Sequence, residues 1–134
     1  MSTINYEVRF SNHPEDARQY GTDRLRKEFL VEKLMVRGEI NMAYSMNDRY
    51  IVGGAVPASE LELTAIDPLK SNYFCERREL GFINVGGAAT IRVDGKDYNL
   101  DYKDALYVGA GSKQILLISK EPERPAHLYF NSAP

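Results

Sequence analysis

The sequence predicts a mainly all-β fold, a barrel or sandwich, preceded by one or two short helices. From about residue 31, apolar residues either alternate with a period of two or form short β-rich runs. These runs recur roughly every eight to twelve residues with turn residues between them, a spacing typical of antiparallel sheets. The 134 residues, 43% of them hydrophobic and 27% charged, suit one soluble domain with a single core.

The first thirty residues contain two helix-start patterns. In SNHPEDARQYG, Ser11 or Asn12 can cap a short helix that has Pro14 at its first position. In TDRLRKEFL, Thr22 or Asp23 can cap a second short helix that leads toward the first apolar run. We therefore predict a helical arm at the N-terminus.

The remainder of the chain is predicted to form strands. The runs are LMV, INMAYSM, RYIVGGAV, GFINV, ATIRV, DYNL, ALYV, QILLIS and HLYF. Asp94 and Gly95 join two of them and suit a type I′ hairpin turn. The VPASELELTAIDPLKSN region is predicted to be an irregular insertion across one barrel mouth, beside a ligand pocket. The domain organisation predicted is an arm over residues 1–30 and a barrel over residues 31–134.

Charge and hydropathy limit the partners. The net charge is −2 and Lys and Arg are scattered singly, so the sequence predicts no nucleic-acid partner. The first residues have no apolar signal region, and no run approaches the roughly 20 apolar residues of a membrane helix. We expect a cytoplasmic protein without a membrane partner. Cys75, the single cysteine, excludes an intrachain disulfide and a cysteine-based zinc cluster.

The stretch YFCERRELGFINVGG resembles the end of the first motif of the cupin jelly-roll barrels, in which Glu79 is followed by six residues and Gly86. DALYVGAGSKQ keeps the shape of the second motif, with Gly111 at its turn. In that family two histidines precede the glutamate, and a third histidine follows in the second motif. Those positions are held here by Asn72 and Phe74, or by Tyr73 and Cys75 if the spacing is one shorter, and by Gln114.

This half-motif is not a complete metal site. Zinc or iron takes three or four nitrogen, sulfur or carboxylate ligands, and the motif offers one carboxylate and one thiol. We predict no metal and no cofactor in this chain. Glu79 is the residual candidate ligand, although an ion pair with a neighbouring arginine is the simpler expectation. Cys75 lacks an activating neighbour in the sequence and is expected to pack in the core.

Other polar residues are weaker candidates. Arg77, Arg78 and Arg49 could clamp a carboxylate and are the predicted substrate-binding residues, with solvated or inter-subunit ion pairs as the alternative. His13 and His127 belong to no spaced ligand pair and are expected to be loop and strand residues. The glycine pairs at 53–54 and 86–87 do not open helices, so we expect bulges or sharp bends rather than phosphate binding.

Longer strings carry a more specific resemblance. KEFLVEKLMV, DRYIVGGAVP, YFCERRELGFINVGGAATIRVDG, DALYVGAGSK and LYFNSAP are similar to the 4-deoxy-L-threo-5-hexosulose-uronate ketol-isomerases, also called 5-keto-4-deoxyuronate isomerases, from about Leu25 to Pro134. The resemblance implies a two-barrel enzyme of pectin and uronate breakdown, about twice this length. It implies an aldose–ketose isomerisation that interconverts 5-keto-4-deoxyuronate and the 2,5-diketo-3-deoxy sugar acid.

The resemblance also implies a division of labour. This chain corresponds to the N-terminal, metal-free barrel, inactive alone, while zinc is bound by histidines and a glutamate of the absent second barrel. The second barrel and further copies of the same protein, as a hexamer, are the implied partners. No catalytic residue can be carried over onto this half.

Two other readings stay open at this point. A self-standing, metal-free cupin could bind a sugar acid as a sensor or carrier, which predicts a wet pocket bearing the arginines. A third reading makes the barrel an enzyme built on Glu79, His127 and tyrosines, which requires those groups to converge. The half-enzyme reading predicts instead an exposed apolar surface for the missing barrel or other subunits.

Overall fold

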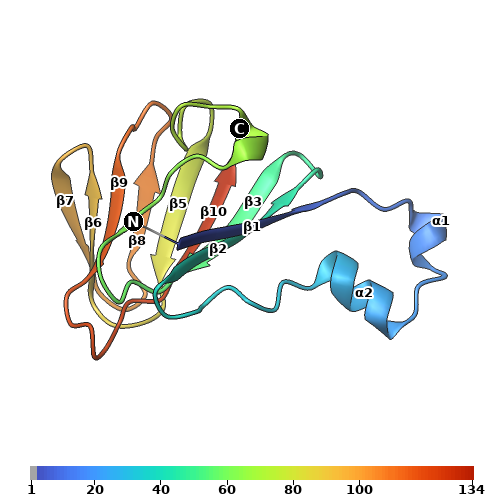
Figure 1. Ribbon diagram of the computed structural model, residues 1–134, viewed down its shortest axis with the longest axis horizontal. Helices are drawn as coiled ribbons and strands as arrows, with labels where there is room; N and C mark the ends of the chain where they lie inside the picture. Colours follow the sequence, from blue (N-terminus) through green and yellow to red (C-terminus); the bar gives the residue numbers. More distant parts are fainter. Residues whose placement is uncertain (1–2) are drawn as a thin grey trace.

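The computed structural model describes residues 3–134 and consists mainly of strands (Figure 1). The elements are β1 (Thr3–Arg9), α1 (Pro14–Ala17), α2 (Thr22–Phe29), β2 (Glu39–Ser45), β3 (Tyr50–Ala55), β4 (Leu61–Glu62), the 3-10 turn η1 (Asp67–Leu69), β5 (Glu79–Asn84), β6 (Ala89–Val93), β7 (Lys96–Leu100), β8 (Ala105–Val108), β9 (Ile115–Ser119) and β10 (Leu128–Ala133). None of the helices among residues 3–134 is long and apolar enough to cross a membrane.

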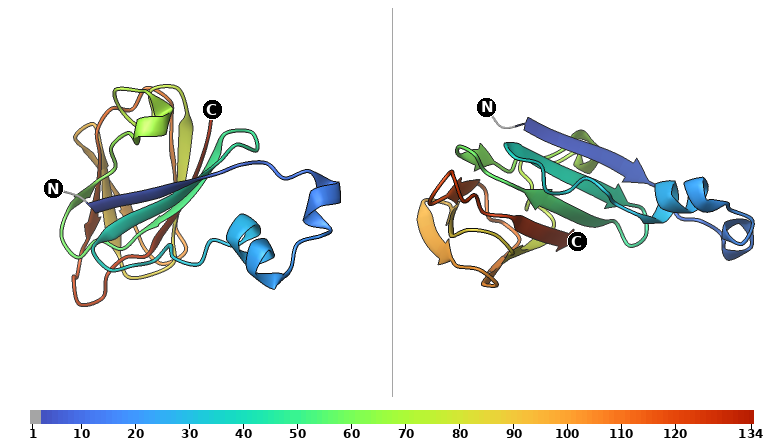
Figure 2. Two further views of the ribbon diagram at one scale, coloured as in Figure 1. Left: turned by 45° about the vertical axis from the view of Figure 1, so that its right-hand side comes forward. Right: turned by 90° about the horizontal axis from the view of Figure 1, so that it is seen from below.

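The strands form two sheets that face each other across the core (Figures 1 and 2). One sheet has the order β1-β2-β3-β10-β5-β8 and the other has the order β4-β9-β6-β7. All pairings between these strands are antiparallel except that of β1 with β2. Alternate side chains of β5 point inward, because Leu80, Phe82 and Asn84 are buried and the residues between them are not.

Phenylalanines occupy the centre of the core. Phe130 of β10 is fully buried and meets Phe74 edge to face at 6.4 Å between ring centroids, and Phe82 at 5.8 Å. A Cβ on Gly53 of β3 would overlap the Phe130 ring, so a glycine is required opposite it. These rings, from β10, β5 and the loop before β5, pack together on the inner face of the six-stranded sheet.

The first strand was not predicted. Thr3–Arg9 pairs in parallel with β2, Asn5 facing Asn41, at the edge of the larger sheet. Ile4, Tyr6 and Val8 alternate with polar residues, so the stretch does carry the period-two signal of a strand, and that signal was overlooked. Residues 4–9 are partly or fully exposed, so neither face of β1 is buried. After β1 the chain leaves the barrel, and α1 and α2 project from it as an arm (Figures 1 and 2).

Both helices were predicted, with different caps. α1 is capped by His13, whose Nδ1 accepts a hydrogen bond from the backbone N–H of Glu15 at 3.1 Å, rather than by Ser11 or Asn12. α2 follows Gly21, which has no side chain to make a capping bond. His13 therefore has a structural role at the helix start.

The predicted strand LMV at residues 34–36 is wrong. This segment pairs with no strand. It passes so close to β3 that a Cβ on Gly54 would lie 2.8 Å from the carbonyl oxygen of Leu34. The strand register runs unbroken through Gly53 and Gly54, so this pair makes close approaches rather than the expected bulge. Gly86 and Gly87 do form a bend, packed against His127 and Arg124.

The insertion is largely irregular but contributes the short strand β4, which pairs with β9 and was not predicted. The hairpin between β6 and β7 is confirmed. Asp94 and Gly95 have φ angles of 49° and 83°, and Val93 faces Lys96 across the turn. Both central residues thus have the left-handed conformation of a type I′ turn.

Candidate functional site

At the positions of the first two histidines of other cupins, Phe74 and Cys75 are core residues, whereas Asn72 is exposed and Tyr73 is half-buried. Phe74 and Cys75 are 1% and 0% exposed and belong to the hydrophobic core. Burial raises the pKa of the Cys75 thiol to about 12, so it stays protonated at neutral pH. Cys75 is therefore a packed, unreactive thiol rather than a ligand.

Glu79 lies outside the barrel. It is exposed at the start of β5, whereas the next residue, Leu80, is buried in the core. Its carboxylate accepts a hydrogen bond from the hydroxyl of Tyr107 on β8, instead of pairing with an arginine as expected. Gln114, at the third histidine position, is exposed, and its backbone N–H donates to Asp94 at 2.9 Å.

These donors do not fit a zinc ion. Within residues 3–134 there is no group of three or more His, Cys, Asp or Glu side chains placed to hold a metal. Glu79 and His127 also do not converge. Glu79 faces Ala133 at one end of the β5–β10 pairing, and His127 precedes Leu128 at the other end. The two residues are therefore separated by about 20 Å along the strand, at roughly 3.3 Å per residue. A site built on both residues is not formed.

The predicted arginines, by contrast, lie around one pocket. Arg49 comes from the β2–β3 turn, and Arg77 and Arg78 from the loop before β5. The pocket has a volume of about 70 Å³. Its wall is completed by Tyr44, Leu69, Ser71, Phe74 and Pro134. It lies at the end of the barrel where η1, the β2–β3 turn and the C-terminus meet (Figure 1).

Arg78 is the buried member, with 5% of its surface exposed. Its Nε donates to the hydroxyl of Ser132 at 2.7 Å, and one terminal nitrogen donates to the carbonyl oxygens of Ser132 and Arg49. The Tyr44 ring lies 5.5 Å from the guanidinium carbon. Burial lowers the pKa of Arg78, because desolvation disfavours its charged form. All these partners are neutral groups.

The other two arginines are exposed. Arg77 pairs with Glu76 at 2.8 Å and donates to the carbonyl oxygens of Leu69 and Lys70. Arg49 makes no ion pair or side-chain hydrogen bond with any residue in the described part of the chain. The structure thus brings the three residues together, and ligand binding by them stays a prediction.

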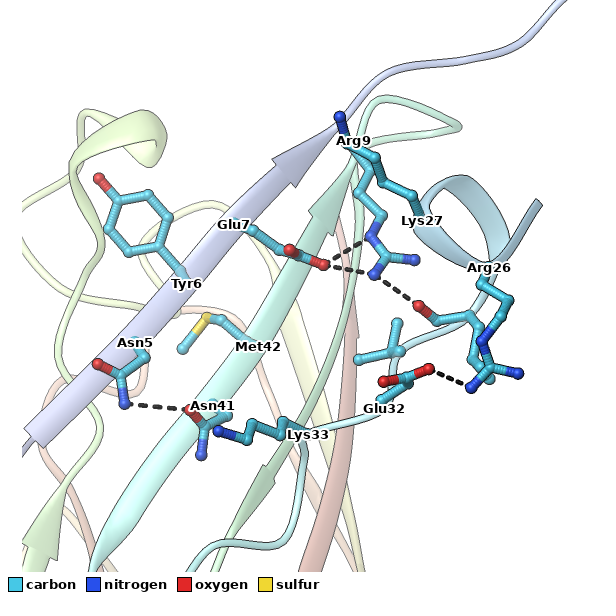
Figure 3. Close-up of a pocket in the computed structure, with 12 residues that line it drawn as sticks. Asn5, Tyr6, Glu7, Arg9, Arg26, Lys27, Glu32, Lys33, Asn41 and Met42 are labelled. Carbon is cyan, nitrogen blue, oxygen red and sulfur yellow. Dashed lines mark hydrogen bonds and ion pairs between the residues drawn. The ribbon is translucent and has the colours of Figure 1, made fainter. Parts of the chain in front are cut away.

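A larger hollow, of about 430 Å³, lies between the β1–β2 edge and the arm (Figure 3). Glu7 and Arg9 of β1 form an ion pair at 2.6 Å, and Arg9 also donates to the carbonyl oxygen of Leu30. Arg26 of α2 pairs with Glu32 on the far side. This hollow was not predicted, because it depends on the pairing of β1 with a strand thirty-odd residues away. Its charges largely pair with one another.

Comparison with known proteins confirms the resemblance. No family model matches the chain. It is 53% identical over 129 residues to the 4-deoxy-L-threo-5-hexosulose-uronate ketol-isomerase of Bacteroides fragilis, covering 96% of this chain and 46% of that protein. The protein of the same name from Formosa agariphila is 53% identical, covering 100% of this chain and 48% of that protein. The one from Halalkalibacterium halodurans is 48% identical, covering 95% of this chain and 46% of that protein. The chain therefore spans about half the length of these relatives.

Solved structures confirm the cupin fold. The Schizosaccharomyces pombe Cnp3 cupin domain matches with a TM-score of 0.52 at 10% identity, over 70% of this chain and 62% of that one. An RmlC-like cupin protein from Desulfovibrio desulfuricans matches with a TM-score of 0.51 at 12% identity, over 75% and 83%. At this identity the likeness concerns the fold alone.

Proposed function

We propose that this chain is the N-terminal, metal-free barrel of a 4-deoxy-L-threo-5-hexosulose-uronate ketol-isomerase. The observation that carries the proposal is identity of about one half to relatives of that name, over nearly the whole chain but only about half of theirs. The complete protein would interconvert 5-keto-4-deoxyuronate and the 2,5-diketo-3-deoxy sugar acid in the cytoplasm.

The chemistry would lie in the second barrel. An aldose–ketose isomerisation moves a proton between neighbouring carbons, which requires a base within hydrogen-bond reach of the substrate. The inward-facing side chains of this barrel are mainly apolar; Asn84, which is buried, donates to the carbonyl oxygens of Gly87 and Leu100, and Glu79 points outward. Because the donors of this chain do not fit zinc, we derive no step through that metal here and expect this half to be inactive alone.

The role of this half would be structural. Its surface supports that role, because several large apolar side chains are exposed. They lie on the arm, on the outer side of β5 and β8, and in adjoining loops: Phe10, Phe29, Ile83, Val85, Tyr102 and Tyr107. We expect these side chains to pack against the second barrel and other subunits of a homo-oligomer, a hexamer by family resemblance.

The proposal is tested by comparing the 134-residue chain alone with the same chain combined with the second half of a relative. The 134-residue chain is assayed for isomerase activity and for bound metal, and then again after co-expression with the complementary half of the Formosa agariphila relative. We expect no turnover and under about a tenth of an equivalent of zinc for the chain alone, and co-purification with activity for the pair. The complementary half alone is the control. Turnover, or about one equivalent of metal, in the isolated chain would refute the proposal.

The arginine pocket favours a second candidate, a self-standing cupin that binds a sugar acid as a sensor or carrier. This candidate predicts that the chain binds an acid while showing no association with the complementary half. The co-expression experiment therefore discriminates between the two.

A further inference from the structure

Arg78 is a buried cation with no anion beside it. Its hydrogen-bond partners are a hydroxyl and two carbonyl oxygens, and no ion pair is formed by it among residues 3–134. A buried charge whose only partners are neutral hydrogen-bonding groups is less stable than one that also has a counter-ion. Arg49 and Arg77 line the same pocket; Arg77 is already paired with Glu76, so the arginine charges there without an ion-pair partner among residues 3–134 are those of Arg49 and Arg78.

The backbone at Arg49 gives an independent observation. Asp48 and Arg49 have φ angles of 58° and 51°, in the left-handed region. This conformation costs a residue with a Cβ about 1–2 kcal/mol, and glycine is favoured in such turns. Arg49 therefore stands where glycine would be more stable, and its guanidinium makes no bond within the described residues. A strained residue whose side chain is unused in the fold is consistent with a ligand contact.

We propose that this pocket binds the carboxylate of a small organic acid, with Arg49 as the direct contact. The guanidinium fork of Arg49 can donate two parallel hydrogen bonds to the two oxygens of a carboxylate. Arg78 adds a fixed positive charge behind it and holds the turn in place through the carbonyl oxygen of Arg49. Arg78 is thus a positioning residue.

The size and walls of the pocket select the ligand. A volume of about 70 Å³ takes one small anionic group, and the remainder of the molecule must extend outward. Leu69 and Phe74 supply apolar lining. A carboxylate has oxygens on one side and carbon on the other, which suits a pocket lined by both arginines and apolar side chains. A phosphate would turn at least one oxygen toward the apolar side.

The pocket can be tested without disturbing the fold. Sodium D-galacturonate is titrated into the 134-residue chain by calorimetry and followed by amide NMR, with D-galactose as the uncharged ligand and inorganic phosphate as the competing anion. Arg49→Gly removes the guanidinium, relieves the left-handed strain and keeps the backbone carbonyl that Arg78 binds. Asp48→Gly relieves the left-handed strain of the preceding residue and keeps the guanidinium, so it is the matched control.

We expect saturable binding of galacturonate that Arg49→Gly weakens by about 10-fold or more, with binding by Asp48→Gly at least as tight as that of the wild type. Both variants should unfold at or above the wild-type temperature. The shifted amides should include those of the β2–β3 turn and of Ser71. The proposal is overturned if galacturonate does not bind at millimolar concentration, if galactose binds equally, if phosphate binds more tightly, or if Arg49→Gly binds like the wild type. This pocket would bind carboxylates whether or not the chain is half of an isomerase.

Discussion

The contact between Gly53 and Phe130 makes a quantitative prediction about the core. The Phe130 ring is fully buried over Gly53, and a Cβ at position 53 would lie within 2.7 Å of several of its atoms. Phe74 and Phe82 surround the ring, so it cannot move aside freely. Gly53→Ala should therefore overpack the core, and Phe130→Ala should open a cavity.

Each substitution has an expected cost. Phe130→Ala removes a fully buried aromatic side chain and should lower the free energy of unfolding by about 3–5 kcal/mol. Gly53→Ala should lower it by about 1–3 kcal/mol, the usual cost of overpacking. In the Phe130→Ala background the clash is absent, so adding the Gly53→Ala methyl should cost about zero or stabilise the strand slightly. The coupling energy between the two positions should thus be about 1–3 kcal/mol.

The assay is urea unfolding of the wild type, both single variants and the double variant at one protein concentration, followed by circular dichroism. Gly81→Ala on β5 is the control, because its Cβ would meet only the side-chain oxygen of Asn131, at 3.4 Å. Its cost should be within about 0.5 kcal/mol of zero. An equal cost of Gly53→Ala in the presence and absence of the Phe130 ring would refute the reasoning.

Two further predictions concern titratable groups. Because burial raises the pKa of Cys75 from 9.0 to about 12, the folded state keeps a proton that the unfolded state loses, so stability is full below about pH 9 and falls as the pH rises. Urea midpoints at pH 8 and 10 should differ more for the wild type than for Cys75→Ala, and equal differences would contradict the assignment. Backbone N–H groups of Gln114 and Lys113 lower the pKa of Asp94, so its contribution is present above the unfolded pKa and lost as the pH falls. Asp94→Asn, which tolerates the same turn, should be less stable than the wild type at pH 7 and equal to it near pH 2; a difference that persists in acid would show that the charge is not the cause.

Local patterns allowed much of the fold to be predicted. The two-residue turn at Asp94 and Gly95 is determined by its own residues, since few others accept two positive φ angles in succession. The strands from β2 onward with a buried face were recognised from their period, apart from the two-residue β4. Pro14 likewise predicted the helix at the start of the arm.

Features that depend on distant partners were missed or misplaced. β1 carries the alternation of a strand in its own residues, which was overlooked, but its parallel pairing with β2, more than thirty residues away, is not readable from a local pattern. The LMV run looks like a strand but crosses Gly54 without a partner strand. Glu79 resembled a barrel ligand in its spacing, yet its place at the first position of β5 turns it outward.

The sequence by itself determined the class of fold, the relationship to the uronate isomerases and the absence of a full histidine motif, because these depend on residue types and short spacings along the chain. Only the tertiary structure decided which side chains meet. Arg49 and Arg78 are 29 residues apart in the chain, and they share one pocket because the β2–β3 turn and the loop before β5 end at the same rim of the barrel. Whether a strand residue faces the core or the solvent is set by its register with neighbouring strands, and register depends on pairing between segments far apart in sequence.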